Sequence, residues 1–143
     1  MKYMFIMRAT AEAAEAYKEI PFEEIIRQMG AYNESLIKAG VMLAGEGLVD
    51  TSEDAGFVVD FSGEPPIVSD GPYGETHELF NGFWIVQVAS KEEALEWARR
   101  CPLGPGSKLE VRRVTEFADM PDFAEFAHVD VARDDAAPRP GIG

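Results

Sequence analysis

The stretch GFWIVQVA, residues 82–89, decides the fold. It is the most strand-like segment of the chain, and its side chains alternate, with Phe83 on one side and Trp84 on the other. Both sides of the segment are apolar, which is typical of a strand that is covered from two directions. The segment KYMFIMR, residues 2–8, has the same character. The sequence therefore predicts a sheet whose central strands are buried on both faces.

Two helices are predicted beside these strands. Apolar residues at helical spacing predict a helix over residues 22–39, followed by Gly40 as a left-handed cap. A capping-box pattern that starts at Ser90 predicts a second helix over residues 91–101, which Pro102 ends. We expect the buried stripe of this second helix to consist of four residues: Ala94, Leu95, Ala98 and Cys101.

Four further extended segments complete the pattern: residues 41–49, 56–61, 67–68 and 108–114. Residues 9–20 fit either a turn of helix or a loop. The order is therefore β-α-β, an inserted β-hairpin, and a second β-α-β. This order predicts an α+β fold of the ferredoxin-like split βαβ type, in which an antiparallel sheet has both helices on one face.

The second face of this sheet needs a cover, because two helices shield only one side of four strands. A second copy of the same sheet is one solution, and it gives a two-fold homodimer whose sheets close into a dimeric α+β barrel. The chain's own tail is the alternative, since residues 115–127 contain four large apolar side chains: Phe117, Met120, Phe123 and Phe126. We expect one domain over residues 1–115 and a partly flexible C-terminal extension over residues 116–143.

Composition narrows the class of protein. The 143 residues fit one domain, and the formal net charge of −13 disfavours binding to nucleic acid or to anionic membranes. The sequence predicts no membrane span and no signal peptide. Cys101 is the single cysteine, so neither a disulfide framework nor a cysteine-rich zinc site is expected. These features together predict a cytoplasmic protein.

The string DGPYGET at residues 70–76 resembles the Asp-Gly-Pro-Phe motif of the YCII-related (DGPF-domain) proteins, with Tyr73 in place of the usual Phe. Further strings typical of that family follow in order along the chain: NGFWI at 81–85, EALEWARRCP at 93–102 and LEVR at 109–112. The resemblance covers about residues 1–115 and implies a dimeric α+β barrel. It implies little about chemistry, because most such proteins have no assigned activity.

Smaller YCII proteins are thought to use a His–Asp pair in a barrel cleft. The histidines here are His77 and His128, and neither lies on the first strand or helix, where that pair's His is expected. The resemblance therefore does not carry the pair over to this chain.

The segment around the DGPY string supplies the candidate catalytic residues. Asp70, Glu75 and His77 form a possible acid/base set, with His77 as the natural proton carrier near neutral pH. Tyr73 is a candidate substrate-binding residue in the same loop. A structural reading competes with this one, since an Asp before Gly-Pro commonly accepts backbone N–H groups and fixes a turn. Most acids of this region also fit a solvated edge.

Three more residues are candidates for substrate binding. Arg8 ends the first strand, so its guanidinium group is expected at one end of a cleft, and Glu46 lies between two glycines where a ligand approaches the backbone closely. An ion pair between Arg8 and Glu46 is the alternative. Tyr32 is expected to point into the same cleft or to belong to the buried stripe of its helix. Cys101 is expected to be a buried structural thiol and not a nucleophile.

The sequence thus favours a small homodimer that binds a small organic molecule in a polar-lined cleft. Cofactor-free proton transfer is the reaction that the candidate residues suit, but the residues do not decide between an enzyme and a binding protein. No metal-ligand spacing and no cofactor-binding motif is present. The alternative is a non-enzymatic interaction module whose acidic surface or Phe-rich tail docks another protein.

Overall fold

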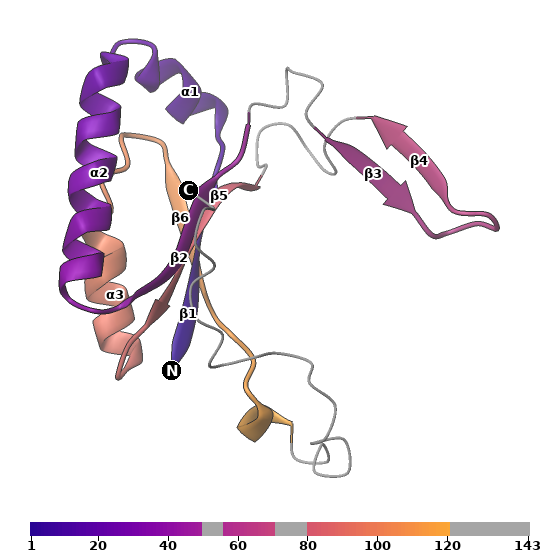
Figure 1. Ribbon diagram of the computed structural model, residues 1–143. Coiled ribbons are helices and arrows are strands. Elements are labelled where there is room, and N and C mark those ends of the chain that lie inside the picture. Colours follow the sequence, from indigo (N-terminus) through magenta and orange to yellow (C-terminus); the bar gives the residue numbers. More distant parts are fainter. Residues whose placement is uncertain (50–55, 71–79, 121–143) are drawn as a thin grey trace.

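The computed structural model describes residues 1–49, 56–70 and 80–120 of the chain. The elements in chain order are β1 (Lys2–Arg8), α1 (Ala11–Tyr17), α2 (Phe22–Lys38), β2 (Met42–Gly47), β3 (Phe57–Asp60), β4 (Ile67–Asp70), β5 (Phe80–Gln87), α3 (Lys91–Arg99), β6 (Lys108–Arg113) and the 3-10 helix η2 (Phe117–Asp119). Helices α2 and α3 lie on one face of the main sheet, and the hairpin of β3 and β4 projects away from it (Figure 1).

The main sheet has four strands in the order β2-β5-β1-β6, and every neighbouring pair is antiparallel. Strands β1 and β5 are central, as their two-sided apolar patterns predict. The mixed α+β architecture with an antiparallel sheet is confirmed, and its topology is consistent with a ferredoxin-like fold. Strands β3 and β4 form a separate two-stranded sheet, which is the inserted hairpin.

The core lies between the sheet and the helices. Phe5 on β1 and Val86 on β5 are fully buried together with Leu36 on α2, and Trp84 is 5% exposed beside them. Phe5, Trp84 and Val86 face the helices because the alternation of each strand sends every second side chain to that side. This face of the sheet therefore provides most of the hydrophobic stabilisation of the fold.

Local signals set the ends of the two long helices. Gly40 follows α2 with a φ of +73°, as expected for a left-handed cap. The Ser90 hydroxyl oxygen accepts a hydrogen bond from the Glu93 backbone N–H at 3.1 Å and so caps α3. The Glu93 carboxylate accepts from the backbone N–H of Ala89, so the expected reciprocal bond to Ser90 itself is replaced by a bond one residue earlier.

The predicted stripe of α3 is wrong at one position. Ala94 is buried and both Ala98 and Cys101 pack against the core, but Leu95 is 50% exposed. Trp97 takes its place in the core. The reason is helical geometry, because positions i, i+3, i+4 and i+7 share a face and Leu95 is not among them.

Strand β2 contains a bulge. Met42 lies opposite Val86, whereas Ala44 lies opposite Ile85, so that Leu43 is an extra residue on this edge strand. The glycine that follows is required by packing: a Cβ on Gly45 would lie 2.8 Å from the Trp84 Cδ1 atom. The close backbone approach expected at this glycine is thus an approach to the Trp84 indole.

The structure also describes residues 9–20 and the start of the tail, two segments for which the sequence left alternatives open. Residues 9–20 contain the short helix α1, whose N-terminus is capped by the Thr10 side chain. In the tail segment 115–127, Phe117–Asp119 form η2, and the Arg113 guanidinium group binds the Asp119 carboxylate through two hydrogen bonds of 2.8 Å. The remainder of the C-terminal extension, from residue 121, lies outside the described residues.

Candidate functional site

The sheet face turned away from α2, named the open face below, carries an apolar strip along its two central strands. Met4 lies opposite Ile85, and Ile6 lies opposite Phe83. Ile6 is 5% exposed, whereas the other three side chains are partly exposed. Strips of this kind on a sheet are seldom left in water, because each large apolar side chain favours burial.

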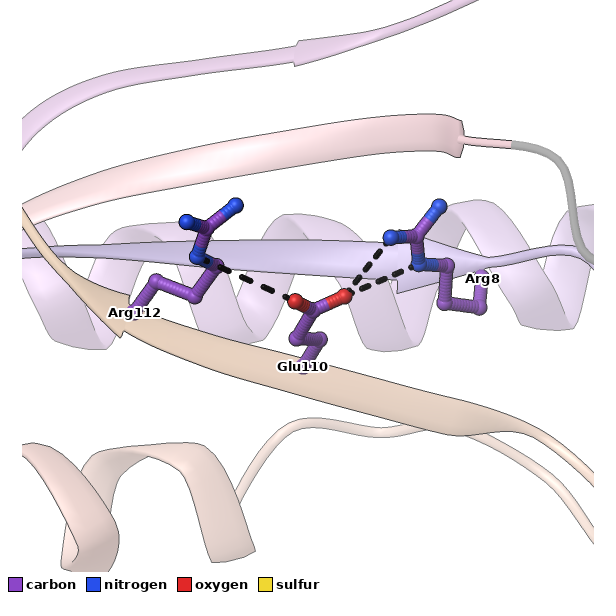
Figure 2. A network of polar contacts seen from close by, with 3 residues as sticks. All are labelled: Arg8, Glu110 and Arg112. Carbon is purple, nitrogen blue, oxygen red and sulfur yellow. Dashed lines mark hydrogen bonds and ion pairs between the residues drawn. The ribbon is translucent and has the colours of Figure 1, made fainter.

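A cluster of charges borders the strip on the side of β6. Arg8 Nε and Nη2 both donate to Glu110 Oε2, at 3.1 and 2.7 Å. Arg112 Nε lies 4.0 Å from the other carboxylate oxygen, so Glu110 is shared between two guanidinium groups. Figure 2 shows the three side chains on the sheet face opposite α2. The cluster has two positive charges for one negative charge, in a chain that is strongly acidic as a whole.

Glu46 borders the strip on its other side. It lies on β2 opposite Phe83, and the same row continues through Ile6 to Glu110 on β6. Two strands therefore separate Glu46 from Glu110. Arg8 forms an ion pair with the Glu110 carboxylate, whereas the sequence offered Glu46 as its alternative partner.

Tyr32 lies on the opposite side of the sheet from these charges. Its side chain is buried between α2 and the sheet, and its hydroxyl donates to the backbone carbonyl of Trp97 at 2.8 Å. The ring meets Trp84 edge to face with centroids 5.4 Å apart. Burial raises the pKa of this phenol above its usual value. Tyr32 therefore occupies the buried stripe of its helix, and the structure does not bring it together with Arg8 or Glu46.

The candidate catalytic residues are divided between described and undescribed parts of the chain. Asp70 is the last residue of β4, where it lies opposite Phe57 and is exposed. Tyr73, Glu75 and His77 lie outside the described residues. The acid/base set therefore stays a prediction, as does the binding role of Tyr73.

Cys101 follows α3 and packs against the core. Burial raises the pKa of its thiol to about 12, so the neutral thiol is the form present near pH 7. A neutral, partly buried thiol is a poor nucleophile. This environment agrees with the expected structural role.

Glu110 is the site residue that sequence reasoning missed. The alternation of residues 108–113 gave the available signal, because Glu110 and Arg112 occupy the same face of their strand. Glu110 pairs with Ile6 and Arg112 with Met4, so both charges lie on the open face. Adjacent acidic and basic positions on one face of an edge strand were the pattern to look for.

The described ranges contain neither a cluster of metal ligands nor a helix that could span a membrane. Within residues 1–49, 56–70 and 80–120 no three His, Cys, Asp or Glu side chains lie close enough together to hold a metal ion. In the same part of the chain, the helices are all too short or too polar to cross a membrane.

The sheet order, the two covering helices and the inserted hairpin define a small α+β protein consistent with the ferredoxin-like class. The family model for the YCII-related domain matches residues 1–118, and the chain belongs to the YCII-related family. It is also 30% identical over 99 residues to an uncharacterized protein, R00369, from Rhizobium meliloti (strain 1021). That match covers 69% of this chain and 78% of the relative.

Proposed function

We propose that this protein is a two-fold homodimer, formed through the open face, that binds a small organic molecule in a polar-lined cleft at the rim of that face. Cofactor-free proton transfer is the chemistry proposed for the bound molecule. The observation that carries the proposal is the apolar strip of Met4, Ile6, Phe83 and Ile85, which lies on the side of the sheet opposite α2.

Hydrophobic burial favours the dimer. Met4, Phe83 and Ile85 remain partly exposed in the single chain, and full burial of one such side chain contributes up to about 1.5–3 kcal/mol. A second copy presents the same strip, so that one two-fold contact covers both. The sheets of the two copies then enclose a shared core.

The charges on the open face favour one orientation of the two copies. Glu46 lies at the β2 side of the strip, and the cluster of Arg8, Glu110 and Arg112 lies at the β6 side. A two-fold axis parallel to the strands brings β2 of one copy opposite β6 of the other. Glu46 then faces the cluster of Arg8, Glu110 and Arg112 in the second copy, whose guanidinium groups carry the complementary charge.

The polar rim supplies the binding groups. Arg8 ends β1 and lies opposite Phe80, the residue with which the described chain resumes after the DGPY string. His77 precedes Phe80 by three positions in the sequence. This closeness in sequence supports a site in which Arg8 and Glu46 orient the ligand and Asp70, Glu75 and His77 transfer the proton.

Sedimentation velocity at micromolar concentration tests the dimer. The wild-type chain is expected to sediment as a dimer, and so is the control Leu95→Glu, which changes an exposed side chain on α3. Ile85→Glu on the open face is expected to give monomers. Monomeric wild-type protein under these conditions would overturn the proposed interface.

Ligand binding is tested by a metabolite screen for thermal stabilisation, since a ligand that binds the folded state raises its Tm. Each positive compound is then tested on the triple variant Asp70→Asn, Glu75→Gln, His77→Asn. Loss of stabilisation with the dimer intact supports the site. Unchanged stabilisation would show that these three residues do not bind the compound.

The β3–β4 hairpin favours a second candidate function, that of an interaction module. One face of the hairpin presents Phe57, Val59 and Val68, with Phe57 70% and Val68 62% exposed. Exposed apolar side chains on a projecting hairpin are typical of protein contacts. Replacing Phe57 and Val68 by Ser, and separately deleting residues 116–143, distinguishes this role. Loss of a partner with ligand binding intact favours the module.

A further inference from the structure

A pocket separate from the apolar strip lies under α1, where β1 ends. Its lining combines the end of β1, two turns of α1 and the segment that leads into β6. Residues that line it include Met7, Arg8, Ala13, Ala14, Tyr17, Leu103 and Ser107. The cavity has a volume of about 110 Å³ and is partly open to solvent. A cavity of roughly 150 Å³ holds benzene in another protein, so a single ring fills a partly open pocket of this size.

Helix α1 forms the roof of this pocket and is fastened at both ends to the turn before β6. At its N-terminus, the Thr10 hydroxyl donates to the Gly106 carbonyl oxygen at 2.8 Å. At its C-terminus, the Tyr17 hydroxyl oxygen accepts from the Gly104 backbone N–H at 3.3 Å. Gly106 has a φ of +82°, and a Cβ there would lie 2.5 Å from the Glu12 Cγ atom, so this turn closely fits α1.

The chemistry of the wall is mostly apolar with one unsatisfied polar atom. Ala13 is 5% exposed and, with Met7 and Leu103, gives an apolar surface. The Ser107 Oγ atom is buried and has no hydrogen-bond partner among the residues that the structure describes. Burying a hydroxyl without a hydrogen-bond partner costs free energy. An occupant that hydrogen-bonds to this hydroxyl therefore binds more tightly than one that does not. The Tyr17 hydroxyl already accepts one bond and keeps its proton for a second.

Charge on the wall is locally balanced. In the described part of the lining Arg8 supplies the guanidinium group, which forms an ion pair with Glu110 on the open face. A carboxylate loses hydration when it enters the pocket, and a guanidinium group that is already in an ion pair offsets little of that cost. A neutral occupant therefore suits the pocket better than a carboxylate.

We propose that the α1 pocket is a binding site for a small neutral molecule with one ring and one hydroxyl group, of the size of phenol. The ring fills the apolar space beneath Ala13 and Ala14, and the hydroxyl bonds to Ser107 Oγ. This site differs from the homodimer interface and from the acid/base residues proposed above, and Arg8 is the one residue of its described lining that the two proposals share.

Phenol and toluene are the probes, and the full-length protein labelled with ¹⁵N is titrated with each in NMR experiments. Both are expected to give saturable shifts of the amide signals of Met7, Ala13, Tyr17 and Leu103. Ser107→Ala is expected to weaken phenol binding about two- to tenfold and to leave toluene binding unchanged, since only phenol bonds to the lost hydroxyl.

A pair of variants on the same helix tests the location. Ala14 lines the pocket and is exposed, so Ala14→Leu is expected to fill the space and weaken both probes at least tenfold while the fold is retained. Ala11 is exposed on the same helix outside the lining, and Ala11→Leu is expected to bind as wild type.

Three results would overturn the proposal: shifts that do not saturate, equal binding by the Ala14→Leu and Ala11→Leu variants, or equal losses of phenol and toluene in Ser107→Ala. The last result would place the ring in the pocket without the proposed hydroxyl bond. None of these measurements depends on the oligomeric state, so a failure here leaves the homodimer proposal untouched.

Discussion

The Tyr32 hydroxyl donates a hydrogen bond to the backbone carbonyl oxygen of Trp97, 2.8 Å away, and this contact joins α2 to α3 inside the core. The same ring meets Trp84 on the sheet edge to face. One side chain thus links the two covering helices to each other and to the central strand β5. Its position makes it a determinant of stability.

Tyr32→Phe is expected to lower the free energy of unfolding by about 0.5–1.5 kcal/mol, because it removes one part-buried hydrogen bond and keeps the ring contact. Chemical denaturation measures the change. Tyr3→Phe is the matched control, since Tyr3 is also buried but its hydroxyl bonds to no other residue among those described. Equal effects of the two substitutions would contradict the role given to the Trp97 contact.

Gly45→Ala is expected to destabilise the fold by about 1–3 kcal/mol, because the new Cβ lies 2.8 Å from Trp84 Cδ1 and 2.7 Å from Met42 Cε. Gly47→Ala on the same strand is the control. Among the described residues a Cβ there has no neighbour within 4 Å, so the destabilisation by Gly47→Ala is expected to be close to zero. Thermal melts of the two variants suffice, and a Gly47 variant as unstable as the Gly45 variant would count against this packing argument.

Cys101 is expected to react slowly with a thiol reagent at pH 8 in the folded protein and rapidly after denaturation. The reason is the pKa of about 12, raised by burial from an ordinary value of 9.0. Fast modification of the native thiol would be inconsistent with this environment.

The same raised pKa gives a direction for alkaline stability. Folding holds the proton on the thiol, so the Cys101 contribution is complete below pH 9.0 and is lost as the pH rises toward about 12. Denaturation at pH 8 and pH 10.5 is expected to show a smaller loss of stability in Cys101→Ala than in the wild type. The raised pKa of Tyr32 acts in the same direction and remains in both proteins.

Charge reversal on the open face tests the proposed orientation of the dimer. Glu46→Arg is expected to weaken dimerisation several-fold, because two like charges then face each other across the interface. Adding Arg112→Glu to that variant is expected to restore it. Glu19→Arg makes the same change in net charge at an exposed position and is expected to have no effect. An equal loss in the double variant would exclude this arrangement of β2 and β6.

Much of the fold was predictable because alternation and helical spacing are local signals. The two faces of β1 and β5 follow directly from residues such as Phe5 and Trp84, and the positive φ of Gly40 from its place after a helix. The exchange of Leu95 for Trp97 in α3 was also readable, since Trp97 stands three residues after the buried Ala94.

The candidate site was less predictable, because it depends on which strands become neighbours. Arg8 and Glu110 are 102 positions apart, and they meet only because β6 pairs with β1. The α1 pocket likewise combines Tyr17 with Ser107 through a helix that composition alone left undecided. Contacts between distant segments carry no local signature, so the residues involved give no hint of one another.

The extra residue at Leu43 has a consequence for how this chain tolerates change. With Leu43 present, two residues of β2 lie opposite Ile85; with Leu43 removed, the strand would pair regularly with β5 and Glu46 would still lie opposite Phe83 on the open face. Shortening this edge strand by one codon at the bulge would therefore bury no charge. Natural variants of this strand should accordingly include some that are one residue shorter.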